Sequence, residues 1–413
     1  MSGKTRGPGR VGRRSVRRIR SGLRRHGLVL RPRAIRRLAQ RHRLRFTSGN
    51  RLLVFSHGAD GLEAMLEAIT SARARIHLET YILRADTTGA RFLDALTDRA
   101  AAGVAVRVLY DAVGSRGLAE SALEPLRRAG GDVVAFNPLR RVWPDFAPRR
   151  RDHRKILVID GKCAFTGGLN IGDEYAHGLG EGDDGWRDTH VRVDGPAVRD
   201  LEAVFLESWF RADGPDIHWE DVLTRAPRPV GDVRCAVLAD GPSYPRRRMR
   251  DFLVGALAES ADRVILETPY FAPGRRVLRA LSAAAQRGAD IDLLLAGRTD
   301  HPILRRAARA ILPQLLERGI RVHEYERAMM HAKVGVFDGN WAFVGTSNLD
   351  QQSLEHSFEV NLILEGGDVV DQLLVAFAAD REGSRRVDRD MLARRGFAER
   401  ALDRASAWLL SLY

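Results

Sequence analysis

Apolar and polar positions follow the same order along two long stretches of the chain. Short apolar runs, expected to be strands, are separated by amphipathic segments of helical length that end at glycines. In the first stretch, strands are expected at Arg75–Leu83, Val104–Tyr110 and Val133–Phe136, with helices at Arg91–Ala102 and up to Gly130. In the second, strands are expected at Val264–Phe271, Ile291–Leu295 and Val322–Tyr325, with helices at Arg275–Arg287 and Ala307–Arg318. This alternation predicts an α/β layer architecture that is used twice.

A polar motif occurs once in each stretch, and its parts keep the same spacing. The first copy reads His153-x-Lys155, then Asp160-Gly161, Gly167-Gly168 and Asn170. The second copy, 178 residues later at every position, reads His331-x-Lys333, then Asp338-Gly339, Gly345-Thr346 and Asn348. The repeat indicates an internal duplication with a candidate site in each copy.

Lysine is the rare basic residue of this chain. Only four of the 67 basic residues are lysines, and two of those four are Lys155 and Lys333. A chain that otherwise uses arginine has kept lysine at both motif positions. This indicates that a compact ammonium charge is needed there, which the planar arginine side chain does not supply.

The spacing of the motif predicts where its side chains point. Residues two apart on a strand face the same way, so each histidine shares a face with the lysine after it. The Asp-Gly pairs are expected to form hairpin turns, and the returning strands then end at glycines that let backbone N–H groups approach an anion. If the two halves meet, two such sets, including Asn170 and Asn348, surround one anion. A phosphodiester is the ligand that this chemistry favours.

Two histidines on either side of a phosphorus atom can divide a substitution reaction between them. A neutral histidine attacks phosphorus and forms a phosphohistidine, while a protonated one gives its proton to the leaving alcohol and then activates the incoming one. Lysines and asparagines would stabilise the phosphate oxygens. An acidic side chain should hold the other nitrogen of a histidine, and Asp188 and Glu359, each placed before a short alternating strand, are the candidates.

Two alternatives stay open from the residues alone. Asp160 and Asp338 either act directly in the chemistry or only form turns. Two histidines with carboxylates also fit a metal site, but a lysine on the same strand face would repel the cation. No His-Glu-x-x-His or Cys-x-x-Cys spacing occurs, so we expect no metal and no cofactor. Cys163 and Cys235 lie in apolar runs and are expected to be buried thiols.

Charge divides the chain unevenly. Residues 1–45 hold 17 basic and no acidic side chains, so the chain's +14 less this 17 leaves −3 for the rest. We expect a flexible basic arm at 1–45, two similar halves at 46–230 and 231–385, and a helical tail at 386–413. The arm suits an anionic membrane surface or the phosphates of nucleic acid, or it stays solvated without a partner.

Two further segments carry exposed aromatic candidates. The first half has 11 extra residues before its motif, Pro138–Pro148, with Trp143 and Phe146. This loop is either a lip at the site or an ordinary surface loop. The tail Phe397–Tyr413 fits either an amphipathic membrane contact or a helix packed on the body. No apolar stretch approaches the roughly 18 residues that span a bilayer, so we expect a peripheral protein at the cytoplasmic face of the membrane.

The doubled motif resembles the signature of the phospholipase D superfamily, His-x-Lys-x4-Asp followed by a glycine-rich corner and an asparagine. The chain is most similar to the bacterial cardiolipin synthases that lack transmembrane helices, over roughly residues 50–370. Segments outside the motif carry the same resemblance: Ile76–Tyr81, Gly103–Ser115, Trp186-Arg187-Asp188 and Gly345–Asp350.

The resemblance implies two α/β halves related by a pseudo-twofold axis, with one active site at their interface and no metal. It implies that His153 is the nucleophile and His331 the general acid. It also implies that one phosphatidylglycerol gives its phosphatidyl group to another, which makes cardiolipin and releases glycerol.

Two positions depart from the family. Gly168 stands where the second copy has Thr346, and Gln351-Gln352 stand where many relatives have an arginine, which leaves headgroup specificity open.

Two other functions compete with lipid transfer. The same chemistry serves nucleases and other phosphodiesterases, although a body of charge −3 lacks the basic track that a nucleic-acid groove needs. A binding protein without catalysis would be expected to have lost a motif residue, and both copies are complete. We therefore expect a phosphatidyltransferase of the cardiolipin synthase type, with a nuclease or related phosphodiesterase as the alternative.

Overall fold

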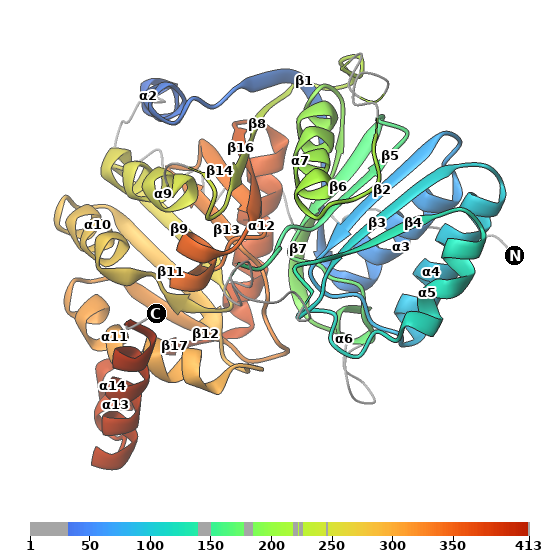
Figure 1. Cartoon of the computed structure of the whole chain (residues 1–413). Coiled ribbons are helices and arrows are strands. Elements are labelled where there is room, and N and C mark those ends of the chain that lie inside the picture. Colours follow the sequence, from blue (N-terminus) through green and yellow to red (C-terminus); the bar gives the residue numbers. More distant parts are fainter. Residues whose placement is uncertain are drawn as a thin grey trace, which may run out of the picture.

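The structure is a computed structural model that describes residues 32–138, 150–176, 185–217, 222, 226–244 and 247–411 (Figure 1). Within these residues, fifteen strands form one continuous sheet. From its centre toward one edge, the order is β1 (Phe46–His57), β7 (Arg187–Asp194), β6 (Cys163–Gly167), β5 (Ile156–Ile159), β2 (Arg75–Thr80), β3 (Ala105–Asp111) and β4 (Asp132–Phe136). Toward the other edge, it is β8 (Val233–Asp240), β16 (Glu359–Glu365), β14 (Trp341–Gly345), β13 (Val334–Phe337), β9 (Arg263–Thr268), β11 (Asp290–Ala296), β12 (Arg321–Tyr325) and β17 (Ser384–Val387).

The two orders match strand for strand, apart from the added β17. β1 and β8 pair antiparallel at the centre, so a pseudo-twofold axis passes between them. Each half has a parallel trio, β2-β3-β4 or β9-β11-β12, and an antiparallel hairpin that carries the motif, β5-β6 or β13-β14. The prediction of two similar α/β halves is therefore confirmed, and the Asp-Gly pairs do lie in hairpin turns.

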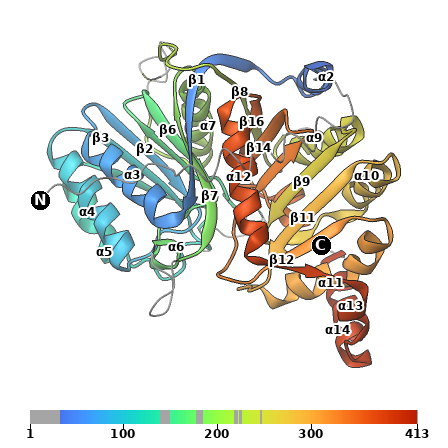
Figure 2. The ribbon, with the colours of Figure 1, turned by 180° about the vertical axis from the view of Figure 1, so that it is seen from behind.

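Helices cover both faces of the sheet. In Figures 1 and 2, α7 (Ala197–Arg211), α9 (Arg248–Glu259) and α10 (Gly274–Gln286) lie on one face, and α3 (Gly58–Thr70) and α12 (Asp368–Glu382) lie on the other. Two of them cross from one half to the other, since α7 contacts β8 and α12 contacts β1. The remaining helices are α2 (Pro32–His42), α4 (Thr87–Ala101), α5 (Glu120–Arg128), α6 (Asp173–Ala176), α11 (Pro302–Glu317), α13 (Arg389–Ala393) and α14 (Phe397–Ser411), with a π-helix, η1 (Gln352–His356), and two short paired strands, β10 (Phe271–Ala272) and β15 (Leu349–Asp350).

One apolar core joins the halves. Phe205 and Trp209 of α7 belong to the same buried cluster as Leu373 and Phe377 of α12. Burying a large apolar side chain stabilises a fold by about 1.5–3 kcal/mol, so separating the halves would expose several such contributions at once. The interface between the halves is thus a fixed surface on which a precise site can be built.

Local chemistry explains where predicted and observed elements differ. The predicted helix Arg91–Ala102 begins earlier, at Thr87, because the Asp86 carboxylate accepts a hydrogen bond from the Gly89 N–H (2.9 Å) and caps it. The helix predicted from Ala307 begins at Pro302, which fits a first helical turn.

Several segments outside the strand–helix pattern have definite positions. Pro32–His42, inside the predicted basic arm, forms α2, whose buried Ile35 and Leu38 pack against α9. Cys163 and Cys235 are buried free thiols, as predicted. Trp143 and Phe146 of the extra loop lie outside the described residues. In the part of the chain that the structure describes, no helix has both the length and the apolar character needed to cross a bilayer.

Candidate active site

The two motif histidines are held by bridges that cross between the halves. The Phe358 N–H donates to the Arg151 carbonyl (2.8 Å), and the His153 N–H donates to the Phe358 carbonyl (2.9 Å). The pseudo-symmetric bridge runs from the Arg187 N–H to the Met329 carbonyl (2.8 Å) and from the His331 N–H to the Arg187 carbonyl (2.7 Å). His153 is thereby fixed beside the start of β16, and His331 is fixed beside the start of β7.

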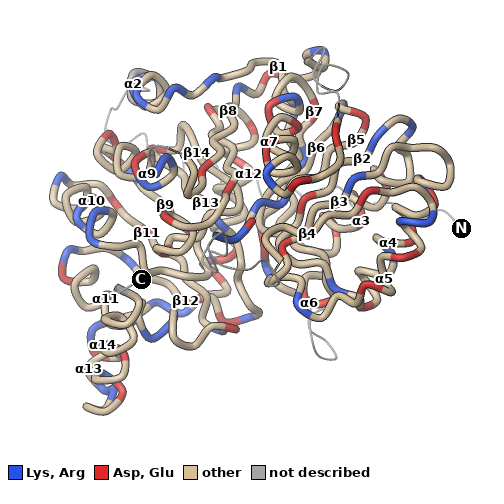
Figure 3. The backbone as a smooth tube through the Cα atoms, in the orientation of Figure 1, with Lys and Arg blue, Asp and Glu red and all other residues tan. Residues whose placement is uncertain are grey.

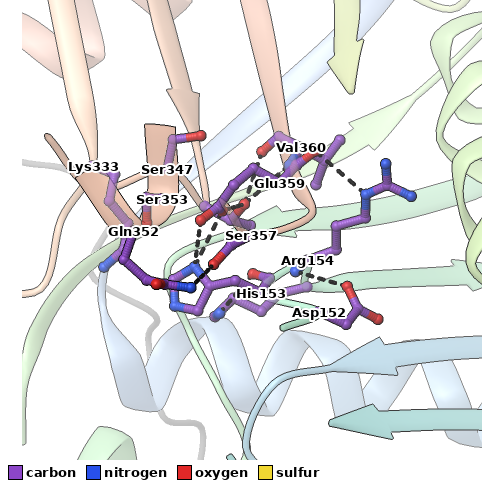
Figure 4. Close-up of polar contacts among 12 residues, drawn as sticks. Asp152, His153, Arg154, Lys333, Ser347, Gln352, Ser353, Ser357, Glu359 and Val360 are labelled. Carbon is purple, nitrogen blue, oxygen red and sulfur yellow. Dashed lines mark hydrogen bonds and ion pairs between the residues drawn. The ribbon is translucent and has the colours of Figure 1, made fainter. Parts of the chain in front are cut away.

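This crossing pairs each histidine with a carboxylate from the opposite half. Nδ1 of His153 lies 3.1 Å from both carboxylate oxygens of Glu359, and Figure 4 shows the two side chains pointing toward one another. Nδ1 of His331 lies 2.8 Å from Oδ2 of Asp188. A carboxylate at Nδ1 favours the tautomer that leaves Nε2 free to act on a ligand. The sequence named both carboxylates, and the structure brings each to its histidine.

Burial dominates the electrostatics of the histidines. It lowers the pKa of His153, which the nearby Glu359 carboxylate partly offsets. Burial and the neighbouring Lys333 ammonium lower the pKa of His331 to about 4, against the opposing effect of Asp188. Both imidazoles are therefore neutral at neutral pH, and an anion beside them would raise their pKa values.

Each lysine follows its histidine by two residues, and its ammonium contacts the backbone of that histidine. The Nζ atom of Lys155 donates to the His153 carbonyl (2.9 Å), and that of Lys333 donates to the His331 carbonyl. Burial lowers the pKa of Lys155 to about 7, with a further lowering by the Lys333 ammonium, and burial lowers the pKa of Lys333 to about 8 against the opposing effect of Asp188. A bound anion would restore full protonation of both, so the pair is suited to a negatively charged ligand.

The asparagines and Thr346 have different surroundings. Asn170 accepts from the Ile82 N–H (3.1 Å) and donates to the Tyr175 hydroxyl (2.6 Å). Asn348 lines the cavity, and its buried Oδ1 has no hydrogen-bond partner among the described residues. The Thr346 hydroxyl donates to Glu359 and accepts from the Val360 N–H (3.0 Å), so it orients the carboxylate rather than facing the cavity.

Gly168, the counterpart of Thr346, is explained by the opposite carboxylate. A Cβ atom at this position would lie 1.9 Å from Oδ1 of Asp188. The departure from the family pattern therefore leaves room for Asp188 close to the backbone, whereas Thr346 meets Glu359 through its hydroxyl.

Asp160 and Asp338 lie at the other end of the motif strands from the histidines. Seven residues of extended chain separate His153 from Asp160, which is about 20 Å. The Asp160 carboxylate accepts backbone hydrogen bonds from Arg73, Ala74 and Arg75, and that of Asp338 accepts them from Ala261, Asp262 and Arg263. Each anchors the chain that enters the adjacent strand, β2 or β9. These backbone contacts favour the turn-forming alternative over a direct role in the chemistry.

The stability of an Asp338→Ala variant tests this reading. Three N–H donors would lose an ionised acceptor, and alanine would be placed at a φ of 50°, so the free energy of unfolding should fall by about 2–3 kcal/mol. Turnover per folded molecule should be unchanged. Asp338→Asn, which keeps an acceptor oxygen and tolerates this φ, is the matched control and should lose less. Loss of turnover in a fully folded Asp338→Asn protein would assign the carboxylate a direct part in the chemistry.

One cavity of about 740 Å³ connects the two histidines. Both imidazoles and both motif asparagines line it, together with aromatic rings of Tyr81, Tyr175, Trp186 and Tyr270. The Tyr81 ring lies edge-on to His153 (5.0 Å between centroids), and Trp186 lies 5.4 Å from His331. Asp350, residues of η1, and two leucines, Leu304 and Leu410, also line the cavity.

Sequence reasoning did not assign these aromatic residues a role. A signal was present for two of them, because Tyr81 and Tyr270 follow the Leu-Glu-Thr segment of the two copies. Tyr175 and Trp186 lie outside any repeat, and only the fold brings them to His331. No group of three or more histidine, cysteine, aspartate or glutamate side chains suited to a metal ion occurs in the described ranges.

Comparison with known proteins finds a matching family model and several similar proteins. A family model described as "Cardiolipin synthase, PLD-like domain" matches residues 65–209 and 253–381. A cardiolipin synthase of Geobacillus thermodenitrificans is 36% identical over 361 residues, which cover 87% of this chain and 72% of the relative. One from Alkalihalophilus pseudofirmus is 36% identical over 364 residues, with 87% and 71% covered. The crystal structure of a phosphatidylserine synthase from Haemophilus influenzae superposes with a TM-score of 0.70 at 13% identity, covering 92% of this chain and 98% of that one, which is a likeness of fold.

Proposed function

Because the chain belongs to the cardiolipin synthase family of phospholipase D-like proteins, we propose that it transfers the phosphatidyl group of one phosphatidylglycerol to the hydroxyl of another, through His153. The observation that carries the proposal is the pair of histidine–carboxylate contacts crossing between the halves at one cavity. The similar proteins are cardiolipin synthases, and this chain is a phosphatidyltransferase of the phospholipase D type.

In the first step, Nε2 of His153 attacks phosphorus while the bond from phosphorus to the headgroup oxygen breaks. His331, protonated once the anionic phosphate is beside it, gives its proton to the leaving glycerol. The products are glycerol and a phosphatidyl group bound to His153. Glu359 holds the His153 ring through Nδ1 and stabilises the positive charge that the ring gains.

In the second step, neutral His331 takes the proton from a hydroxyl of the second phosphatidylglycerol. The oxygen attacks phosphorus, the phosphorus–nitrogen bond breaks, and cardiolipin leaves. Lys155 and Lys333, with Asn348, stabilise the charge on the nonbridging oxygens in both transition states. The two steps consume two phosphatidylglycerols and yield one cardiolipin and one glycerol.

The assay that tests the function uses phosphatidylglycerol in mixed micelles, with a chelator present, and lipid mass spectrometry. We expect cardiolipin and free glycerol in equal amounts. Phosphatidic acid alone would mean that water is the acceptor. If the preparation forms no lipid product but cleaves single-stranded or duplex DNA, the protein is a nuclease and the proposal is wrong.

We also propose that the basic segment at residues 1–45 holds the protein at an anionic membrane, at the cytoplasmic face. Each basic side chain near such a surface contributes on the order of 1 kcal/mol, and the segment holds 17. Residues 1–31 lie outside the described part of the chain. Cosedimentation with vesicles tests the idea: equal binding to neutral and anionic vesicles at low salt would contradict it.

A further inference from the structure

Helix α14 (Phe397–Ser411) is packed with its apolar face outward. Toward the body it buries polar side chains, Asp403 (3% exposed) and Ser406 (9%). Its opposite face is apolar and open to solvent, with Phe397 79%, Leu402 52% and Leu409 37% exposed. Ala398, Ala401 and Ala405, also exposed, lie between them on the same side of the helix. We call these six residues the α14 face.

Specific contacts hold the helix in this orientation. Both carboxylate oxygens of Asp403 accept hydrogen bonds from the Arg395 guanidinium, one of them at 3.4 Å, in the turn before the helix. The helix packs along α11, and Leu410 near its end reaches the wall of the active-site cavity beside Leu304 of α11. Figures 1 and 2 both show α13 and α14 projecting from the second half next to α11. The outward face is therefore a fixed feature of the fold, and the opposite, body-facing side of the same helix reaches the cavity through Leu410.

We propose that the α14 face docks onto a phospholipid bilayer and brings the cavity to the surface from which its lipid substrates come. The inference rests on the proposed function for the identity of the substrate. An amphipathic helix lying in the interfacial plane buries an apolar face of this kind among the headgroups and upper acyl chains. Leu410, on the body-facing side with Asp403 and Ser406, connects the same helix to the wall of the cavity.

Charge around the helix suits an anionic bilayer. Between residues 381 and 404, seven exposed arginines accompany four exposed carboxylates, and basic positions are visible along this part of the chain in Figure 3. Arg404, on the edge of the α14 face, has a long stem that can follow the apolar surface while its guanidinium reaches the phosphates.

The size of the face argues against a second copy of the chain as its partner. A helix of 15 residues is about 22 Å long and, with its side chains, about 10 Å wide. One side of it offers far less than the roughly 800 Å² per partner that a stable protein interface buries. A bilayer needs no such matched area, because the exposed basic side chains around the helix can contact the same membrane surface.

The test compares two triple variants with the wild-type full chain. One changes the α14 face: Phe397→Ser, Leu402→Ser and Leu409→Ser. The matched control changes three comparably exposed apolar residues elsewhere: Leu53→Ser, Phe210→Ser and Val230→Ser. Binding to vesicles of phosphatidylcholine and phosphatidylglycerol is measured by cosedimentation, and activity is measured on both these vesicles and a short-chain, monomeric phosphatidylglycerol. We expect the α14 variant to bind vesicles at least about tenfold more weakly, with the control unchanged.

The separate readouts keep the outcomes distinct. Activity on the short-chain lipid should survive in the α14 variant, while activity on vesicles should fall with binding. Equal vesicle binding by the α14 variant and the wild type would overturn the proposal, as would a wild-type dimer in sedimentation that the α14 variant alone abolishes. If the triple variant does not fold by circular dichroism, Phe397→Ser, at the most exposed position, is measured in its place. Absence of any lipid product from the wild type would refute the proposed function, and the vesicle-binding comparison would still decide on α14.

Discussion

Replacing His331 by alanine is expected to leave an enzyme that completes only half of its reaction. With a phosphatidyl ester of p-nitrophenol as donor, the His331→Ala protein should release one equivalent of nitrophenol per active site and then stop. His153→Ala should release none above the background. With phosphatidylglycerol as donor, cardiolipin formation should fall by at least about 10³-fold in both variants.

The difference follows from which step needs a proton. Nitrophenolate is a good leaving group and departs without one, so attack by His153 needs no general acid. The second step needs a base to take the proton from the incoming hydroxyl, and His331 is the imidazole on the other side of the cavity. Without it, the phosphatidyl group stays on His153. Intact-protein mass spectrometry, with acid avoided because it hydrolyses the phosphorus–nitrogen bond, should find the added mass of the phosphatidyl group. Peptide mapping should place that mass on His153.

The opposite pattern has a definite meaning. A burst in His153→Ala and none in His331→Ala would exchange the roles of the two histidines, since the geometry of the two pairs is nearly symmetric. Steady release without a burst in either variant would exclude a covalent intermediate on these residues.

Much of this site could be predicted because its information is local and repeated. The alternation of His153 and Lys155, the Asp-Gly turns and the glycine corners follow from short-range rules, and the duplication marks them twice. The sequence also named Asp188 and Glu359. It did not indicate that each would serve the histidine of the other half, because that pairing depends on the bridges of Asp152 with Phe358 and of Arg187 with Met330. Those bridges form only when the whole sheet is assembled.

Two other features show where local patterns stop being sufficient. Asp160 and Asp338 belong to the motif as firmly as the histidines, yet extended chain carries them to the far end of the hairpin. Periodicity in the C-terminal segment predicts an amphipathic helix, but not which side packs inward. The contact of Asp403 with Arg395 and the packing along α11 decide that, and they turn the apolar side outward.

The second large effect is expected at Asp188, whose Oδ2 contacts His331 and whose Oδ1 accepts the Thr189 N–H (2.7 Å). Its carboxylate accepts the Nδ1 proton of His331 and leaves Nε2 to exchange protons with the lipid. In Asp188→Asn, the amide N–H can donate to Nδ1 and favour the tautomer with its proton on Nε2, which cannot act as a base. By analogy with the same change in hydrolase triads, cardiolipin formation should fall by about 10³–10⁴-fold. Glu359→Gln should act in the same way on His153.

A positioning role for Asp188 has a signature in pH that loss of stability would not produce. The Asp188 carboxylate raises the pKa of His331 against the effects of burial and Lys333. Its removal lowers that pKa, so protonated His331 is lost at lower pH, and the alkaline limb of the kcat profile should move toward acid. The burst with the nitrophenyl donor should be affected much less, because that step needs no acid.

Asp380→Asn is the control, since Asp380 is also buried but binds the Arg187 guanidinium (2.8 Å). It should lower the melting temperature while leaving the position of the alkaline limb unchanged, and an equal shift of that limb in both variants would mean that Asp188 acts through the fold and not through His331.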